Sequence, residues 1–226
     1  MMRRFVPIAL LLVAASCVDD QVVLRRGPLG PAAYEVEVSA SGGGQGLEEH
    51  RLASLRITPR KDGSDFALRA EPEGRQITAR IRRRRNGTID LLGVRGAPVD
   101  RSRQAELASL VGQLAPPLPL SPVRIGEQWS SSQHIRTSTL RAVLRTELGI
   151  SRFRRIASID AAQLEGTVRG QLETNTPAGF LSGRLRGLTS IAWAVESGRV
   201  VSSETNLVWT LTGGDTVTLV TRVRPR

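Results

Sequence analysis

The chain has 226 residues, of which 40% are hydrophobic, 23% are charged and 4% are aromatic, and its formal net charge is +11. This length suits one large domain or two small ones, and a domain near 200 residues buries enough surface for a substantial core. The composition excludes a collagen-like chain, a disulfide-dense scaffold and a polytopic membrane protein.

The positive charge comes almost entirely from arginine, since Lys61 is the only lysine. Two interpretations stay open: an anionic partner (nucleic acid, phospholipid headgroups or an acidic cell-wall polymer), or a generic basic surface without a dedicated site. Base-stacking surfaces need aromatic residues among the basic ones, and no zinc-finger, helix-turn-helix or RNP-like pattern is present. We therefore expect no nucleic-acid partner.

Residues 1–16 have the pattern of a secretory signal peptide. Arg3 and Arg4 give a positive start, and an apolar stretch of eleven residues follows from Phe5 to Ala15. A helix needs about 20 residues to span a bilayer, so this stretch is too short for a transmembrane helix. The sequence predicts an exported protein.

The end of this leader, Ala14-Ala15-Ser16-Cys17, resembles the lipobox of bacterial lipoproteins. The resemblance implies cleavage before Cys17 and attachment of acyl chains such as palmitate, which would anchor the protein to a bacterial cell membrane on its periplasmic or extracytoplasmic face. The family usually has leucine where this chain has Ala14, so cleavage by an ordinary signal peptidase stays open. Cys17 is the only cysteine, and acylation accounts for an otherwise unpaired thiol in an exported chain.

Residues 17–33 are expected to form a tether between this lipid anchor and a single β-rich domain of residues 34–226. The tether contains Gly27-Pro28-Leu29-Gly30-Pro31, which no regular element accommodates. Period-two alternation then predicts strands over 34–39, 52–58 and 66–70. His50 is expected in a solvated loop between the first two strands.

A β-hairpin is predicted over residues 77–92. Apolar and polar residues alternate on both sides of Asn86-Gly87, a pair that favours a type I′ turn. Next to the tip lie four consecutive arginines: Arg82, Arg83, Arg84 and Arg85. They are either a weak anion-binding site or solvated charges that protect an edge strand from aggregation.

One amphipathic helix is predicted over about residues 100–115, followed by a proline-rich link to about residue 122. Asp100 can cap its start, and Pro116 and Pro117 end it. Because an apolar stripe at helical spacing must be buried, we expect the helix to pack on the sheet. The stripe consists of Leu107, Leu110, Val111 and Leu114.

The second half of the chain contains strand patterns over 139–148, 164–173, 181–195, 200–212 and 216–223. Gly166 and Gly170 lie in the apolar row of one of them, which predicts sharp curvature or close packing by the helix. Nine or ten antiparallel strands must curl or close. The expected fold is mainly β: a strongly curved antiparallel sheet, half-barrel or barrel, with the helix against its concave face.

The segment from Pro122 to Trp129 resembles a Pro-Val-x-x-Gly-x-x-Trp motif of bacterial lipoproteins. Those proteins have long antiparallel strands after the motif, and the family has no assigned activity. The expected architecture also resembles that of curved-sheet lipoprotein carriers, which hold acyl chains between sheet and helix; this is a likeness of fold alone. Trp129, Trp193 and Trp209 are expected to belong to the core, because buried aromatic residues mostly serve packing.

No catalytic set stands out. His50 and His134 lack partners at metal-ligand spacing, and no Gly-x-Ser-x-Gly elbow is present. We expect no enzyme, metal or cofactor, and predict a membrane-anchored envelope module that binds or scaffolds a protein or amphiphile partner. Two alternatives stay open: an electrostatic adaptor for anionic lipid or cell-wall polymer, and a hydrolase that uses His134 with a nearby serine.

Overall fold

The computed structural model describes residues 21–24, 32–42, 47–60, 63–71, 76–83, 89–96, 110, 113–114, 116, 118–136, 140–176 and 179–226. An antiparallel sheet of eleven strands dominates it, where sequence patterns predict nine or ten. The strands are β1 (Ala32–Gly42), β2 (Leu47–Arg60), β3 (Gly63–Glu71), β4 (Gln76–Arg83), β5 (Ile89–Gly96), β6 (Gln128–Arg136), β7 (Leu140–Ile156), β8 (Ile159–Thr176), β9 (Gly179–Ala194), β10 (Arg199–Leu211) and β11 (Thr216–Pro225).

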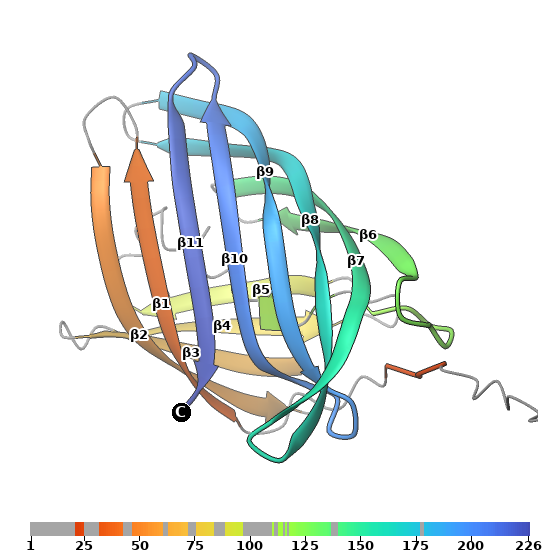
Figure 1. Cartoon of the computed structure of the whole chain (residues 1–226). Coiled ribbons are helices and arrows are strands. Elements are labelled where there is room, and N and C mark those ends of the chain that lie inside the picture. Colours follow the sequence, from red (N-terminus) through yellow and green to blue (C-terminus); the bar gives the residue numbers. More distant parts are fainter. Residues whose placement is uncertain are drawn as a thin grey trace, which may run out of the picture.

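Chain order and sheet order agree except at one point. The sheet runs β5-β4-β3-β2-β1-β11-β10-β9-β8-β7-β6, so each half is a meander of sequential strands. The halves meet where β1 pairs with β11, which joins the two ends of the domain near the middle of the sheet (Figure 1). Pairing of the first strand with the last therefore joins the two halves into one sheet.

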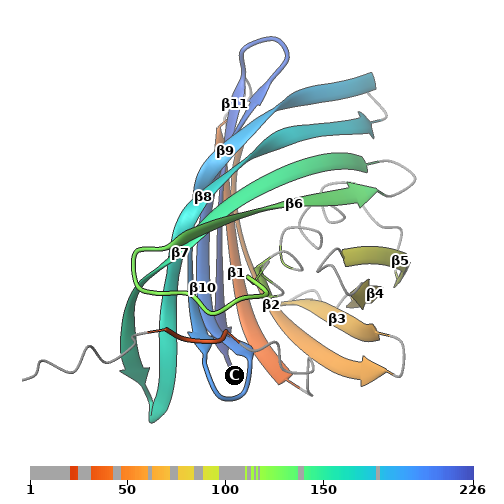
Figure 2. The same ribbon diagram turned by 90° about the vertical axis from the view of Figure 1, so that its right-hand side faces the viewer.

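The sheet is strongly curved but open. β5 and β6 are its edges; they approach each other in space, yet among the described residues no backbone pairing joins them. Figure 2 shows β7–β11 as one curved wall, with β2–β5 turning round to the opposite side of a concave space. The prediction of a mainly-β, strongly curved antiparallel sheet is confirmed, and closure into a barrel is wrong.

Glycine permits this curvature. β8 has 18 residues and at about 3.3 Å per residue would extend to about 60 Å, so it must bend to stay in a single domain. A Cβ on Gly166 would collide with the carbonyl oxygen of Glu147 in β7, and one on Gly187 with that of Asn206 in β10. The neighbouring strand, rather than a helix, makes the close approach that the glycines allow.

The main core lies on the concave face. Side chains from both halves of the sheet meet there, and residues outside the strands cover them. The phenol of Tyr34 in β1 donates to the carbonyl of Val200 in β10 at 3.0 Å, and burial raises the pKa of Tyr34. Members of this core include Val36, Leu55, Phe66, Ile77, Ile150, Leu164, Trp193 and Val200 from the strands, and Leu24, Leu110, Leu114, Leu118 and Val123 from elsewhere.

The predicted helix of residues 100–115 lies mostly outside the described residues, and the elements named for the described part are all strands, but Leu110, Gln113 and Leu114 have helical backbone. Two residues of its apolar stripe, Leu110 and Leu114, are described, and both are 1% exposed within the main core. Between them, the amide oxygen of Gln113 accepts a hydrogen bond of 3.1 Å from the hydroxyl of Ser203 in β10.

The described part of the predicted tether contacts the domain. Val22 forms a β-bridge with Val123, and Leu24 is 3% exposed in the main core. β1 begins at Ala32, two residues before the predicted start of the domain. The leader and Cys17 lie outside the described residues, and no helix of the described part is long and apolar enough to cross a membrane.

The Pro-Val-x-x-Gly-x-x-Trp segment forms the approach to β6. Val123 is buried in the core, and the N–H of Gly126 (φ +86°) donates to the carbonyl of Ile150 at 2.9 Å. The Glu127 carboxylate accepts from the N–H of Arg124 at 2.9 Å, and Trp129 then packs against the core. Val123 and Trp129 thus have packing roles, and Gly126 has a turn role, because a positive φ favours glycine.

Candidate functional site

One row of side chains crosses six strands on the concave face. Backbone pairing places Gln133 of β6 opposite Leu144 of β7, and the row continues through neighbouring strands to β11. Its members in sheet order are Gln133, Leu144, Gly170, Leu185, Trp209 and Val217. We call this set the concave row.

Three members of the concave row, Leu144, Leu185 and Trp209, belong to or pack on an apolar cluster separate from the main core. Leu185 is 8% exposed, whereas Leu144, Trp209 and Leu219 are only partly buried against the cluster. The other buried members are Ala142, Val168, Leu172 and Leu207. This end of the concave face is therefore less completely covered by described residues than the end that holds the main core.

Two buried donors lie at the flanks of this apolar surface. The amide nitrogen Nε2 of Gln133 and the indole nitrogen Nε1 of Trp209 have no hydrogen-bond partner among the described residues. Gln133 is 6% exposed, so its amide is withdrawn from bulk water. A buried donor without a partner costs about 1–3 kcal/mol unless a water or a bound molecule supplies the acceptor.

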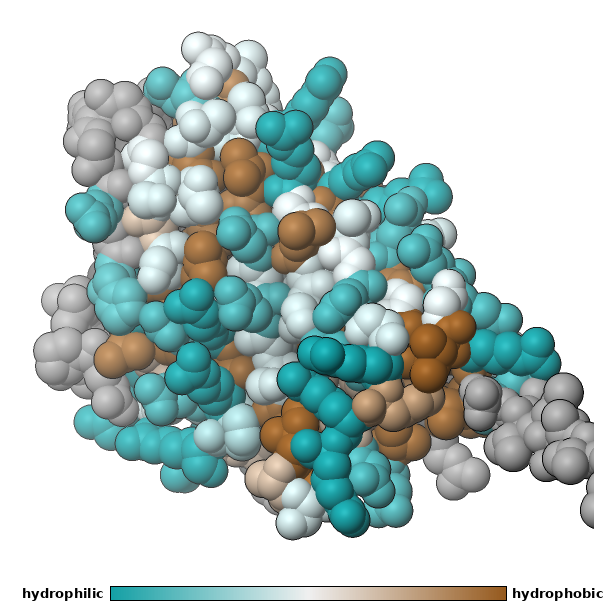
Figure 3. Space-filling model, viewed as in Figure 1, coloured by the Kyte–Doolittle hydropathy of each residue, from teal (hydrophilic) through white to brown (hydrophobic). Residues whose placement is uncertain are grey.

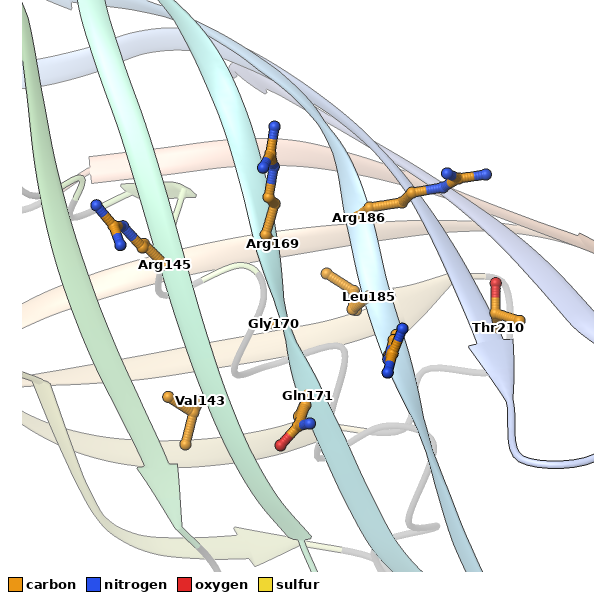
Figure 4. Close-up of a pocket in the computed structure, with 9 residues that line it drawn as sticks. Val143, Arg145, Arg169, Gly170, Gln171, Leu185, Arg186 and Thr210 are labelled. Carbon is orange, nitrogen blue, oxygen red and sulfur yellow. The ribbon is translucent and has the colours of Figure 1, made fainter.

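The convex face of the same strands carries a groove of about 860 Å³ lined by four arginines. Arg145 of β7, Arg169 of β8 and Arg186 of β9 lie directly opposite one another across neighbouring strands, and Arg184 lies two residues before Arg186. Figure 4 shows Arg145, Arg169 and Arg186 projecting from three adjacent strands, with Val143 and Gln171 beside them. We call Arg145, Arg169, Arg184 and Arg186 the arginine cluster.

The arginine cluster has few counter-charges. Arg145 pairs with Glu147 at 3.6 Å, but Arg169, Arg184 and Arg186 have no ion pair among the described residues. Figure 3 shows this convex side of the sheet, where hydrophilic side chains surround separate hydrophobic ones.

Elsewhere on the convex face, charges are paired across four strands. Glu37 of β1 contacts His50 of β2 at 3.1 Å and Arg222 of β11 at 3.4 Å, and Arg222 also contacts Glu204 of β10 at 3.4 Å. The hydrogen bond from His50, with further help from Arg222, holds the pKa of Glu37 below its usual value. The expectation that His50 lies in a loop is wrong, because β2 begins three residues earlier than His50.

The arginine run predicted at the hairpin tip is only partly described. Arg82 and Arg83 end β4, where they pair with Asp90 and Ile89 of β5, so the predicted hairpin pairing is confirmed. β4 lies between β3 and β5 and is therefore not an edge strand. Arg84, Arg85 and the Asn86-Gly87 turn lie outside the described residues.

His134 lies on the convex face of β6, opposite Val143, and is exposed. Within the described part of the chain it has no hydrogen bond to a serine or carboxylate, so the hydrolase alternative gains no paired nucleophile there. No group of three or more His, Cys, Asp or Glu residues that could hold a metal ion is found among the described residues.

The three tryptophans lie where packing was predicted. Trp193 is 0% exposed in the main core, Trp129 packs against that core, and Trp209 packs against the second cluster. Trp209 differs from the other two in belonging to the concave row.

Comparisons with models of protein families, with curated proteins and with solved structures find no match for this chain. Its function is therefore argued from its own residues.

Sequence reasoning missed both the concave row and the arginine cluster. Every residue of the arginine cluster falls in a predicted strand, so alternation could have placed each one on a face. Only the pairing register brings Arg145, Arg169 and Arg186 side by side, and register is a property of the sheet rather than of any one strand.

Proposed function

We propose that this protein is a lipid-anchored module of a bacterial cell envelope that binds an amphiphile on its concave face without catalysing a reaction. The observation that carries the proposal is the concave row: apolar side chains across several strands, flanked by the unpartnered donors of Gln133 and Trp209. Acyl chains would lie on the leucines, and the two donors would bind oxygen atoms of the ligand's polar part.

The segment that contains Leu110 and Leu114 covers the main core, beside the concave row rather than over it. Gln113 of this segment accepts from Ser203 of β10, so the concave row is left with less cover from the described residues. Binding sites between an amphipathic element and a sheet are mostly apolar with a few directed polar groups. The concave row has that composition.

The lipid anchor rests on the leader and on Cys17. Three residues, and so four Cα–Cα steps, lie between Cys17 and Gln21, which the structure describes beside the domain. An extended chain covers at most about 14 Å over that length. An acylated Cys17 would therefore hold the domain close to the membrane surface, where amphiphiles are available.

The amphiphile site is tested by titration with an uncharged apolar dye such as N-phenyl-1-naphthylamine, followed by displacement with a single-chain phospholipid. We expect saturable binding to the wild type and affinity at least tenfold lower in Leu144→Arg, because a charge would stand in the middle of the apolar row.

The matched control is Leu188→Arg, since Leu188 lies on the convex face of β9 and is 65% exposed. Thermal unfolding followed by circular dichroism verifies that both variants are folded. The proposal is wrong if the wild type binds no dye saturably, or if both variants lose affinity equally.

A further inference from the structure

We propose that the arginine cluster on the convex face is a binding site for two or more phosphate groups held close together. This inference does not rest on the proposed amphiphile site, which lies on the opposite face of the same strands. It concerns Arg145, Arg169, Arg184 and Arg186, which line the groove with Gln171 and Thr210.

Without a bound anion, the positions of the facing arginines destabilise the folded protein. Directly opposite residues on antiparallel strands have Cβ atoms about 4.5–5.5 Å apart, and like charges in such positions destabilise the sheet. Arg145 faces Arg169, and Arg169 faces Arg186, so two repulsive pairs share the central arginine. An anion bound between the guanidinium groups would turn this repulsion into attraction.

The local carboxylates do not neutralise the cluster. Glu147 contacts Arg145 at 3.6 Å, and Glu173, the other carboxylate near the groove, lies opposite Arg141. Arg169, Arg184 and Arg186 have no ion pair within the described residues, although ion pairs do form elsewhere on the convex face. The cluster thus keeps about three uncompensated positive charges in one groove.

The residue type and spacing indicate phosphate. A guanidinium group is planar, always charged and binds phosphate oxygens in pairs, which an ammonium group does not do. Neighbouring strands lie about 4.8 Å apart, so the three facing arginines span about 10 Å. That length exceeds one phosphate and suits a diphosphate, a polyphosphate segment or adjacent phospholipid headgroups.

Two exposed apolar residues border the cluster. Val143 is 47% exposed and lines the groove, and Leu188, 65% exposed, lies two residues after Arg186 on the same face. Apolar side chains among arginines suit a lipid surface, where they reach the acyl boundary while the arginines bind phosphate. Free phosphate chains offer the same chemistry without that apolar contact.

The test uses the full chain with Cys17→Ser in every variant, so that no acyl chain contributes to binding. Isothermal titration with inorganic tripolyphosphate compares the parent with Arg169→Gln/Arg186→Gln. We expect the double variant to bind at least tenfold more weakly, because two of the guanidinium groups that would bind the phosphates are removed.

The matched control is Arg95→Gln/Arg154→Gln, which removes the same charge from two exposed arginines outside the groove. We expect less than a threefold loss in this control. Equal losses in both double variants would show that net charge alone attracts the anion, and would overturn the site, as would an absence of measurable binding to the parent.

A vesicle arm distinguishes the two sources of phosphate. Co-sedimentation with phosphatidylglycerol vesicles should show the same order of affinities if lipid headgroups are the ligand; binding of tripolyphosphate alone would assign the site to a soluble phosphate compound.

As a folding control, the thermal midpoint of Arg169→Gln/Arg186→Gln in phosphate-free buffer should equal or exceed that of the parent, since like-charge repulsion is relieved. A lower midpoint would contradict the repulsion on which the site is argued.

Discussion

Glu37 lies in a network of charges on the convex surface. Its carboxylate receives a hydrogen bond from His50 and lies 3.4 Å from Arg222, while its own side chain is 26% exposed. These contacts stabilise the ionised carboxylate in the folded state and lower its pKa. The unfolded chain lacks them.

We expect Glu37→Gln to be less stable than the wild type at pH 7 by less than about 1 kcal/mol, the range measured for partly exposed ion pairs. Because the folded-state pKa is lower than the unfolded value, this contribution is present above about pH 4.5 and is lost as the pH falls through the folded-state pKa. Urea unfolding at pH 7 and pH 3.5 measures it. The difference between wild type and variant should shrink at the lower pH, and a difference that grows would contradict this account.

Glu35→Gln is the control, because it removes a carboxylate from the same face of β1 that has no ion pair among the described residues. We expect its effect at pH 7 to be smaller than that of Glu37→Gln.

At the scale of elements, the β7–β8 hairpin turns through two strained residues. Ile156 pairs with Ile159, and between them Ala157 and Ser158 have φ values of 44° and 71°. Both central residues with positive φ make a type I′ turn, which prefers Asn-Gly. A residue other than glycine costs about 1–2 kcal/mol in the left-handed region.

Ala157→Asn/Ser158→Gly should therefore stabilise the protein by about 1 kcal/mol and raise the midpoint of thermal unfolding by about 2–4 °C for a domain of this size. Differential scanning calorimetry measures this shift. Ser197→Gly is the control, since Ser197 lies in the β9–β10 turn without a positive φ and should gain nothing. An unchanged or lowered midpoint in the double variant would argue against strain at this turn.

The same hairpin shows why strands were predictable and their register was not. Alternation along β7 and β8 places apolar and polar residues on opposite faces, and the structure confirms those faces. Continuing the register of the turn would place Arg145 opposite Gly170, but a bulge between Ile150 and Arg152 shifts the pairing so that Arg145 faces Arg169. A bulge adds one residue to one strand and leaves no clear pattern in the sequence.

At the scale of the whole molecule, one set of strands carries two different surfaces. The concave face of β6–β11 holds the apolar row with its two unpartnered donors, and the convex face of β7–β9 holds the arginine cluster. The concave row includes Gly170 and Trp209, for which the sequence predicted only curvature and packing. Arg82–Arg85 attracted notice as a run of one residue type, whereas the arginine cluster is assembled from four non-consecutive arginines in three strands.

The overall curvature was predictable from local signals, and its degree was not. Glycines in the apolar row of β8 and the number of strands both predict a sheet that must bend. Whether such a sheet closes depends on its two edges, and pairing of β5 with β6 has no signature within either strand. The described edges remain unpaired, so the concave face stays open to a covering segment or a ligand.

The placement of this domain at a membrane is tested most directly by metabolic labelling with radioactive or alkynyl palmitate in a bacterial host, comparing the wild type with Cys17→Ala. The account predicts label on the wild-type protein in the membrane fraction and none on the variant, because Cys17 is the only cysteine. Equal labelling of both proteins, or an unlabelled wild type that keeps Met1 and a free thiol in the soluble fraction, would contradict it.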